Sequence, residues 1–227
     1  MSAQRCAFFL RGVNLGGKNT VRMADLRAVA AELGAAEVAT HLASGNLLAV
    51  PPETAPPTAG APSTAPPATS APRPADQPTP PDAFALALAA ALEERCGFAV
   101  PVVARGAGEL RAALEASPFG AHTREADRDE AREALLFFAA AVPEAQRSAL
   151  DREVQALARG GEEVWVGERH ARIWYANGAH GSRLSQALFE RRLGMTVTAR
   201  NLRTLRAVAA RLEARRARPA DAVGWCG

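Results

Sequence analysis

The chain has 227 residues, of which 48% are hydrophobic and 22% are charged, and its formal net charge is +3. This composition is typical of a globular protein, and the length allows one domain or two small ones. No apolar run approaches the roughly 18 to 20 residues that span a bilayer, and the N-terminal segment lacks a signal-peptide pattern, so we expect a cytoplasmic location and no membrane partner.

The first predicted element is a strand over residues 6–10, and a glycine-rich loop follows it. The loop reads "RGVNLGGKNT" over residues 11–20, and Gly12 with Gly17-Lys18 comes close to the P-loop pattern. Asn19 stands where the P-loop hydroxyl would bind magnesium, and the next helical pattern begins only near Met23. The sequence therefore argues against a P-loop NTPase.

A weaker interpretation of this loop is an anion-binding nest. Gly12, Gly16 and Gly17 leave backbone N–H groups uncovered, while Arg11 and Lys18 add positive charge for a phosphate or carboxylate. Lys18 is the only lysine among 27 basic residues, which suggests that this position needs a compact ammonium. The alternative is a glycine turn with a solvated Lys18. Asn14 lies in the same loop and belongs to the candidate site.

The rest of the first half completes a βαββαβ order. Helical spacing predicts a helix over residues 23–34, and alternation predicts strands over 37–44 and 47–50 that form a hairpin. A helix over 82–97, with Asp82 as N-cap and Gly97 as C-cap, and an edge strand over 98–105 follow. Ser44-Gly45-Asn46 forms the hairpin turn, where Ser44 and Asn46 are candidate ligand contacts or simply turn residues.

The stretch from Pro51 to Pro81 interrupts this half. It holds twelve of the sixteen prolines and no aromatic residue. Such a composition predicts a disordered, polyproline-like spacer, with a proline-rich docking site as the alternative.

The second half repeats the same order of elements. We predict a connecting helix over 108–117, a strand over 133–142, a helix over 143–160, and a hairpin over 162–167 and 169–176. A helix over 182–194, a strand over 195–200 and a last helix over 201–217 follow. The sequence thus predicts an α+β fold of two ferredoxin-like (βαββαβ) subdomains plus a C-terminal helix, with subdomains at 1–106 and 107–217 and a tail at 218–227.

Three arginines fall in the predicted first turns of helices, where a cation opposes the helix dipole. They are Arg183, Arg200 and Arg203, and the neighbouring Ser182 and Asn201 are natural helix caps. An anionic ligand would explain this placement, and surface salt bridges are the alternative.

Several stretches together resemble the bacterial family called domain of unknown function 1697. They read "LRGVNLGGKNTVRMADLRAVAAELG", "HLASGN", "CGFAVPVVAR", "GSRLSQALFERRLG" and "TARNLRTLRAVA". The resemblance implies an α+β protein with two ferredoxin-like subdomains and implies no established activity. The chain departs from the family pattern with Arg183 in place of a lysine, Leu202 in place of an aromatic residue, and His41 where tyrosine is common.

The cysteines and histidines give no metal-binding pattern. Cys6, Cys96 and Cys226 are widely spaced, and the four histidines show no i, i+4 pairing, so we expect a reduced protein without a metal site. No motif identifies a cofactor.

The function that we expect is a module that binds a phosphate-bearing or other anionic small ligand. Its site would gather the glycine loop, the Ser44–Asn46 turn and the arginines near the later helices. One alternative is an enzyme acting on an anionic substrate, although no nucleophile or general base stands out. The other is a nucleic-acid-binding protein that uses the basic last helix.

Overall fold

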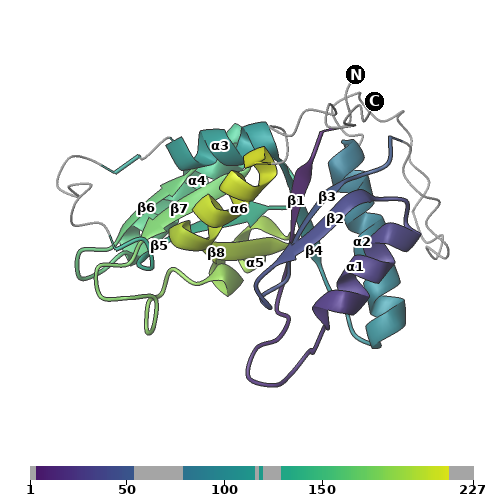
Figure 1. Cartoon of the computed structure of the whole chain (residues 1–227). Coiled ribbons are helices and arrows are strands. Elements are labelled where there is room, and N and C mark those ends of the chain that lie inside the picture. Colours follow the sequence, from purple (N-terminus) through teal and green to yellow (C-terminus); the bar gives the residue numbers. More distant parts are fainter. Residues whose placement is uncertain (1–3, 54–78, 116–117, 120–128, 215–227) are drawn as a thin grey trace, which may run out of the picture.

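A computed structural model describes residues 4–53, 79–115, 118–119 and 129–214, and it contains two four-stranded antiparallel sheets (Figure 1). The first sheet has the order β2-β3-β1-β4. Its strands are β1 (Cys6–Leu10), β2 (Ala36–His41), β3 (Asn46–Val50) and β4 (Val102–Gly106), and its helices are α1 (Met23–Glu32) and α2 (Pro80–Cys96).

The second sheet repeats this topology with the order β6-β7-β5-β8. Its strands are β5 (Glu133–Phe138), β6 (Glu163–Val166), β7 (His170–Trp174) and β8 (Val197–Asn201), and its helices are α4 (Glu144–Leu157) and α5 (Gln186–Leu193). Helices α3 (Ala107–Glu115) and α6 (Leu202–Ala214) complete the chain. The α+β class and the two ferredoxin-like subdomains are confirmed.

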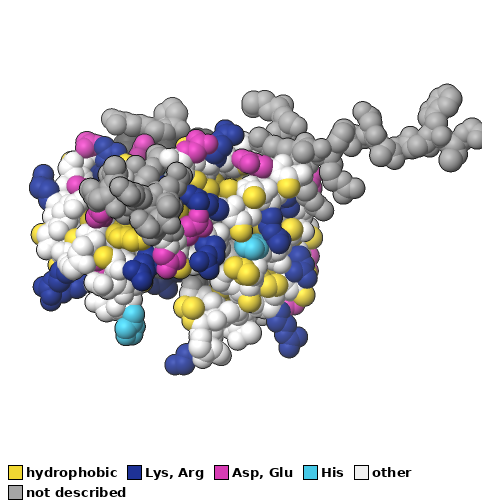
Figure 2. Space-filling model, turned by 60° about the vertical axis from the view of Figure 1, so that its left-hand side comes forward, with side chains coloured by type: hydrophobic (Ala, Val, Ile, Leu, Met, Phe, Trp, Pro, Cys, Tyr) yellow, Lys and Arg dark blue, Asp and Glu magenta, His cyan; other side chains and the backbone are white. Residues whose placement is uncertain are grey.

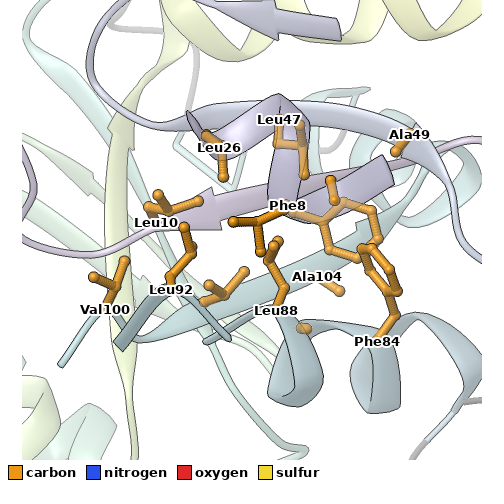
Figure 3. Packing of buried hydrophobic residues seen from close by; sticks show 14 of the residues in the cluster. Phe8, Leu10, Leu26, Leu47, Ala49, Phe84, Leu88, Leu92, Val100 and Ala104 are labelled. Atoms are coloured by element: carbon orange, nitrogen blue, oxygen red, sulfur yellow. The ribbon is translucent and has the colours of Figure 1, made fainter. Parts of the chain in front are cut away.

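Each half has a core between its sheet and its own pair of helices. In the first half, Phe8 and Leu10 of β1 are fully buried against Leu88 and Leu92 of α2, and the rings of Phe8 and Phe84 lie 5.0 Å apart (Figure 3). Side chains alternate along a strand, so these residues share one face of β1.

The opposite faces of the two sheets share a third core. Phe9 of β1 and Phe137 of β5 are fully buried, and their rings stack at 5.2 Å with an interplanar angle of 9°. Leu110 of α3 and Leu205 of α6 pack into the same cluster. Both faces of β1 and β5 are therefore covered, which explains why these two strands read as continuous apolar runs.

Several predicted boundaries were wrong, and the differences have local causes. The helix expected from residue 182 begins at Gln186, because Ser185 rather than Ser182 is the N-cap and its hydroxyl accepts a hydrogen bond from the Leu188 N–H. Arg200 lies on β8 and not in a helix. Thr79 caps α2 in place of Asp82, since its hydroxyl accepts from the Asp82 N–H.

Other predictions coincide with elements or lie outside the described residues. Gly97 ends α2 with a φ of 76°, as expected of a C-cap glycine, and β4 is an edge strand of its sheet. Most of the proline-rich stretch (residues 54–78) and the tail at 218–227 lie outside the described residues. In the part of the chain that is described, no helix combines the length and apolar character needed to cross a membrane.

Candidate functional site

Asn14 organises the glycine loop that follows β1. Its side-chain amide donates to the Val21 carbonyl at 3.0 Å and to the Ala43 carbonyl at 2.5 Å, and its side-chain oxygen accepts from the Val21 N–H at 2.9 Å. The backbone of Asn14 is left-handed, with φ of 56°. Asn14 thus closes the base of the loop and ties it to the β2–β3 turn.

The tip of the loop is a tight turn over Gly16 and Gly17, whose φ values are 56° and 79°. The Lys18 N–H donates to the Leu15 carbonyl at 3.0 Å, so the tip is a small hairpin rather than a cradle at a helix N-terminus. Lys18 is exposed, and among the described residues it has no ion pair. The loop hangs from the lower end of the first half, between β1 and α1 (Figure 1).

Arg200 of β8 fastens the second half to the first. Its Nε donates to Asn46 Oδ1 at 2.6 Å, and one terminal nitrogen donates to the Leu10 and Ser44 carbonyls at 2.6 and 2.9 Å. The other terminal nitrogen donates to the Thr198 hydroxyl at 3.0 Å. Burial lowers the pKa of Arg200 to about 10. The guanidinium is therefore engaged with the protein itself. We call these residues the Arg200 cluster.

The Ser44–Asn46 turn is part of this cluster. The Asn46 side chain is fully buried, and its amide donates to the His41 carbonyl at 2.9 Å and to the Ser44 hydroxyl at 3.0 Å. A Cβ added to Gly45 would lie 2.7 Å from the Leu10 Cβ, so glycine is required by packing as well as by its φ of 76°. The contacts of this turn therefore hold the two halves of the protein together.

Arg11 makes a second link between the halves. Its guanidinium forms a two-pronged ion pair with Glu190 of α5, with N–O distances of 2.6 and 2.5 Å, and Glu190 also accepts from the Val197 N–H at 3.2 Å. Burial alone would raise the pKa of Glu190, but its hydrogen bonds, led by those from Arg11, hold that pKa below the usual value. The hydrogen bond from Arg11 to Glu190 raises the pKa of Arg11 in turn.

Ser182 and Arg183 lie in a different place, in a pocket of about 210 Å³. Its walls are the loop between α4 and β6 and the loop between β7 and α5, which the Asn177 amide joins by donating to the Gly160 carbonyl at 3.2 Å. Arg159 and Arg183 are exposed here, and in the described part of the chain neither has an ion-pair partner. We call this the arginine pocket; it is also lined by His180 and Glu162.

Asn201 and Arg203 lie at the start of α6. The Asn201 side chain accepts from the Thr204 N–H at 2.8 Å, which confirms that it caps the helix. Arg203 is 72% exposed and faces Asp129 at 3.8 Å, and Arg206 pairs with Glu130. Of the three arginines expected in first helical turns, only Arg203 lies in one.

The sequence profile described as Protein of unknown function (DUF1697) matches residues 3–61 and 75–171, which is more than half of the chain. The chain belongs to this family. Among solved structures, this DUF1697 chain is similar to the conserved bacterial protein SP0830 from Streptococcus pneumoniae, with a TM-score of 0.56 and 21% identity over 92% of this chain and 98% of that one. At this identity the likeness shows the fold alone. A search of curated proteins found no match.

The structure separates the residues that sequence reasoning placed in one site of this DUF1697 protein. It brings Arg11, Asn14, Ser44, Asn46 and Arg200 together at the joint between the halves, where their polar groups bond to the protein. Three further groups lie elsewhere, namely the Gly16–Lys18 tip, the Ser182–Arg183 pair, and Asn201 with Arg203 at the start of α6.

Sequence reasoning missed Arg159 and His180, which line the arginine pocket. The signal that could have found them is the glycine content of their loops. Gly160 and Gly181 have φ values of 59° and 83°, in the left-handed region that favours glycine, and each stands beside one of these residues.

Proposed function

We propose that the protein binds a small phosphate-bearing or other anionic ligand in the arginine pocket. The observation that carries the proposal is that Arg159 and Arg183 line one pocket without an ion-pair partner among the described residues. Each guanidinium group carries a planar fork of N–H donors that matches the oxygens of a phosphate or carboxylate, and here two such groups line one pocket without an ion-pair partner among the described residues.

The size and backbone of the pocket support a compact anion. A volume of about 210 Å³ is below the roughly 300 to 1,000 Å³ of clefts for drug-sized ligands. Gly160, Gly178 and Gly181 add no side-chain bulk, so an anion can approach the backbone closely. Two arginines against the single carboxylate of Glu162 leave the pocket with net positive charge.

The test is calorimetric titration of inorganic phosphate and pyrophosphate into the wild-type protein and single variants. Arg183→Ala removes charge-assisted hydrogen bonds worth roughly 1.5 to 3 kcal/mol, so we expect its affinity to fall about tenfold or more. Arg203→Ala is the control, because it removes another exposed arginine that lies outside the pocket, and its affinity should equal that of the wild type. Equal affinities of Arg183→Ala, Arg159→Ala and the wild type would refute the proposal.

The variant Lys18→Ala tests whether the glycine loop contributes to the same binding site. Both the glycine loop and the loop between β7 and α5 project from the lower end of the molecule (Figure 1), and no hydrogen bond between described residues joins them. A loss of affinity in Lys18→Ala would extend the site to the glycine loop. An unchanged affinity would confine the site to the arginine pocket.

An enzyme acting on an anionic substrate is the second candidate, because His180 lines the same pocket. An imidazole beside bound phosphate is suited to general acid–base catalysis. Hydrolysis of a phosphomonoester by the wild type, lost in His180→Asn with phosphate binding retained, would support this candidate. Absence of turnover in the wild type would count against it for this substrate class.

The observations favour nucleic-acid binding less. On the face shown in Figure 2, basic side chains are interspersed with acidic ones rather than gathered in one patch. On α6, Arg203 and Arg206 face Asp129 and Glu130, which reduces the positive charge available to phosphates. Arg215 and Arg216 lie outside the described residues.

A further inference from the structure

A larger cavity lies at the other end of the first half, away from the glycine loop. Its volume is about 720 Å³, and four prolines, Pro51, Pro52, Pro80 and Pro81, form part of its wall. The first two prolines follow β3 and the other two begin α2. Arg169, just before β7, lines it from the second half. We call this cavity the proline pocket.

The walls of the proline pocket suit an apolar ring. Its volume falls within the roughly 300 to 1,000 Å³ typical of small-molecule sites. Proline rings lose no rotamer freedom when they are covered, so they form a rigid apolar surface at little entropic cost. Gly106 and Gly108 leave room beside them because they carry no side chain.

The polar groups of the proline pocket are mainly acidic. Arg169 is already held by Asp82, at 3.1 Å, and by Glu109, at 3.4 Å. Glu109 lines the pocket and accepts from the Gly106 N–H at 3.0 Å. Glu53 lines it as well, and it has no ion pair within the described residues. Two carboxylates, Glu53 and Glu109, thus line the pocket against one arginine, and that arginine is also paired with Asp82 behind the lining.

Cys6 lies in the wall of the same pocket, and the nearby carboxylates affect the pKa of its thiol. Burial, together with the smaller effect of the charges of Glu109 and Asp82, raises the pKa of its thiol to about 11. The thiol therefore stays protonated at neutral pH, and the electrostatic field at this wall disfavours negative charge.

We propose that the proline pocket binds a small molecule in which an apolar ring carries a protonated amine. The ring packs against the four prolines, and the ammonium group donates hydrogen bonds to the carboxylate of Glu109. Its charge preference is opposite to that of the arginine pocket, so this site is independent of the function proposed above.

The experiment compares three probes of nearly equal shape on the full-length protein. They are phenethylamine, 2-phenylethanol and 3-phenylpropanoate, titrated by ligand-observed NMR. We expect the amine to bind about tenfold or more tightly than the alcohol, because a charge-assisted hydrogen bond is worth roughly 1.5 to 3 kcal/mol, and the carboxylate to bind most weakly. Equal binding of amine and carboxylate, or no binding of the amine, overturns the proposal.

Single substitutions identify the carboxylate that binds the ammonium group. Glu109→Gln should reduce amine affinity about tenfold and leave the alcohol unchanged, since only the charged contact is lost. Glu94→Gln, on the exposed surface of α2, is the matched control. Glu53→Gln replaces Glu109→Gln in the test if the latter fails to fold. We expect Glu53→Gln to lower the affinity for the amine as well, but by a smaller factor. Saturating phosphate should not displace the amine, so failure here leaves the arginine pocket unaffected.

Discussion

Arg200 and Arg183 are equivalent in the sequence argument but not in the structure. The Arg200 guanidinium lies over the Phe9 ring at 5.6 Å and donates to six oxygens from both halves. Arg183 is exposed and unpaired among described residues. A half-buried guanidinium whose donors are all engaged stabilises the fold, whereas an exposed one at a pocket is available to a ligand.

Replacing Arg200 should therefore lower stability rather than ligand affinity. Arg200→Ala leaves buried oxygens of Leu10 and Asn46 without their donor, and we expect a loss of about 3 kcal/mol in the free energy of unfolding. Arg200→Lys should recover only part of it, because an ammonium cannot match the planar set of donors. Urea unfolding of both variants measures this, with Arg203→Ala as control. A loss below about 0.5 kcal/mol, which is typical of exposed positions, would contradict the structural role.

The residue types of the joint could be predicted from the sequence, but their roles could not. Helix-dipole reasoning selected Arg183, Arg200 and Arg203 because helices were expected to begin at residues 182 and 201. The first helix begins four residues later, and Arg200 lies on a strand. Which arginines bond within the protein depends on contacts between residues as distant as Leu10 and Arg200, and no local pattern encodes such contacts.

At the scale of elements, the order of strands and helices was predicted well because it depends on local periodicity. Continuous apolar runs such as residues 6–10 and 133–138 mark the central strands, which both the helices and the other half cover. The turn between β2 and β3 was also recognised, although it spans the four residues 42–45 and Asn46 is the first residue of β3. Its tight packing against Leu10 and Val13 was not, because that contact joins different elements.

Two glycines distinguish backbone strain from packing. Gly45 and Gly16 both have positive φ, of 76° and 56°, but an added Cβ would lie 2.8 Å from the Val13 Cγ2 at Gly45 and would meet nothing within 4 Å at Gly16. Gly16→Ala should cost about 1 kcal/mol from backbone conformation alone. Gly45→Ala should cost at least about 2 kcal/mol, since overpacking adds to that strain. Thermal and urea unfolding of the pair measure the difference, and equal losses would show that the turn relaxes freely.

At the scale of the whole molecule, the two halves are joined by an apolar core and by several polar links. The apolar core centres on the Phe9–Phe137 stack and is flanked by α3 and α6. The polar links include the Arg200 cluster, the Arg11–Glu190 pair, the Arg169–Asp82 ion pair and the hydrogen bonds from Arg105 to the Phe138 and Arg169 carbonyls. Such an arrangement makes each half depend on the other, although either half alone has the topology of a complete ferredoxin-like unit.

The Arg11–Glu190 link should make stability depend on pH. The pKa of Glu190 is lower in the folded protein than its usual value, so the link stabilises the fold above that usual value and is lost as the pH falls through the folded pKa. Because the Arg11 side chain is 37% exposed, solvent screening limits the contribution to about 1 kcal/mol. Urea unfolding from about pH 7 to about pH 3 should show the wild type losing its advantage over Glu190→Gln. A difference in unfolding free energy between the two proteins that does not change with pH would contradict this prediction.

The shared core predicts that the protein unfolds in a single transition. Trp165 and Trp174 lie in the second half, so in a Trp225→Phe background their fluorescence reports on that half, while far-UV circular dichroism reports on both. Since Phe9 and Phe137 bury each other across the two sheets, neither half keeps a complete core when the other unfolds. The two signals should share one midpoint in urea. Phe137→Ala should lower both together, by about 3 to 5 kcal/mol of unfolding free energy. Separate midpoints, or a Phe137→Ala effect confined to the fluorescence signal, would mean that the halves fold independently and that the joint only docks them.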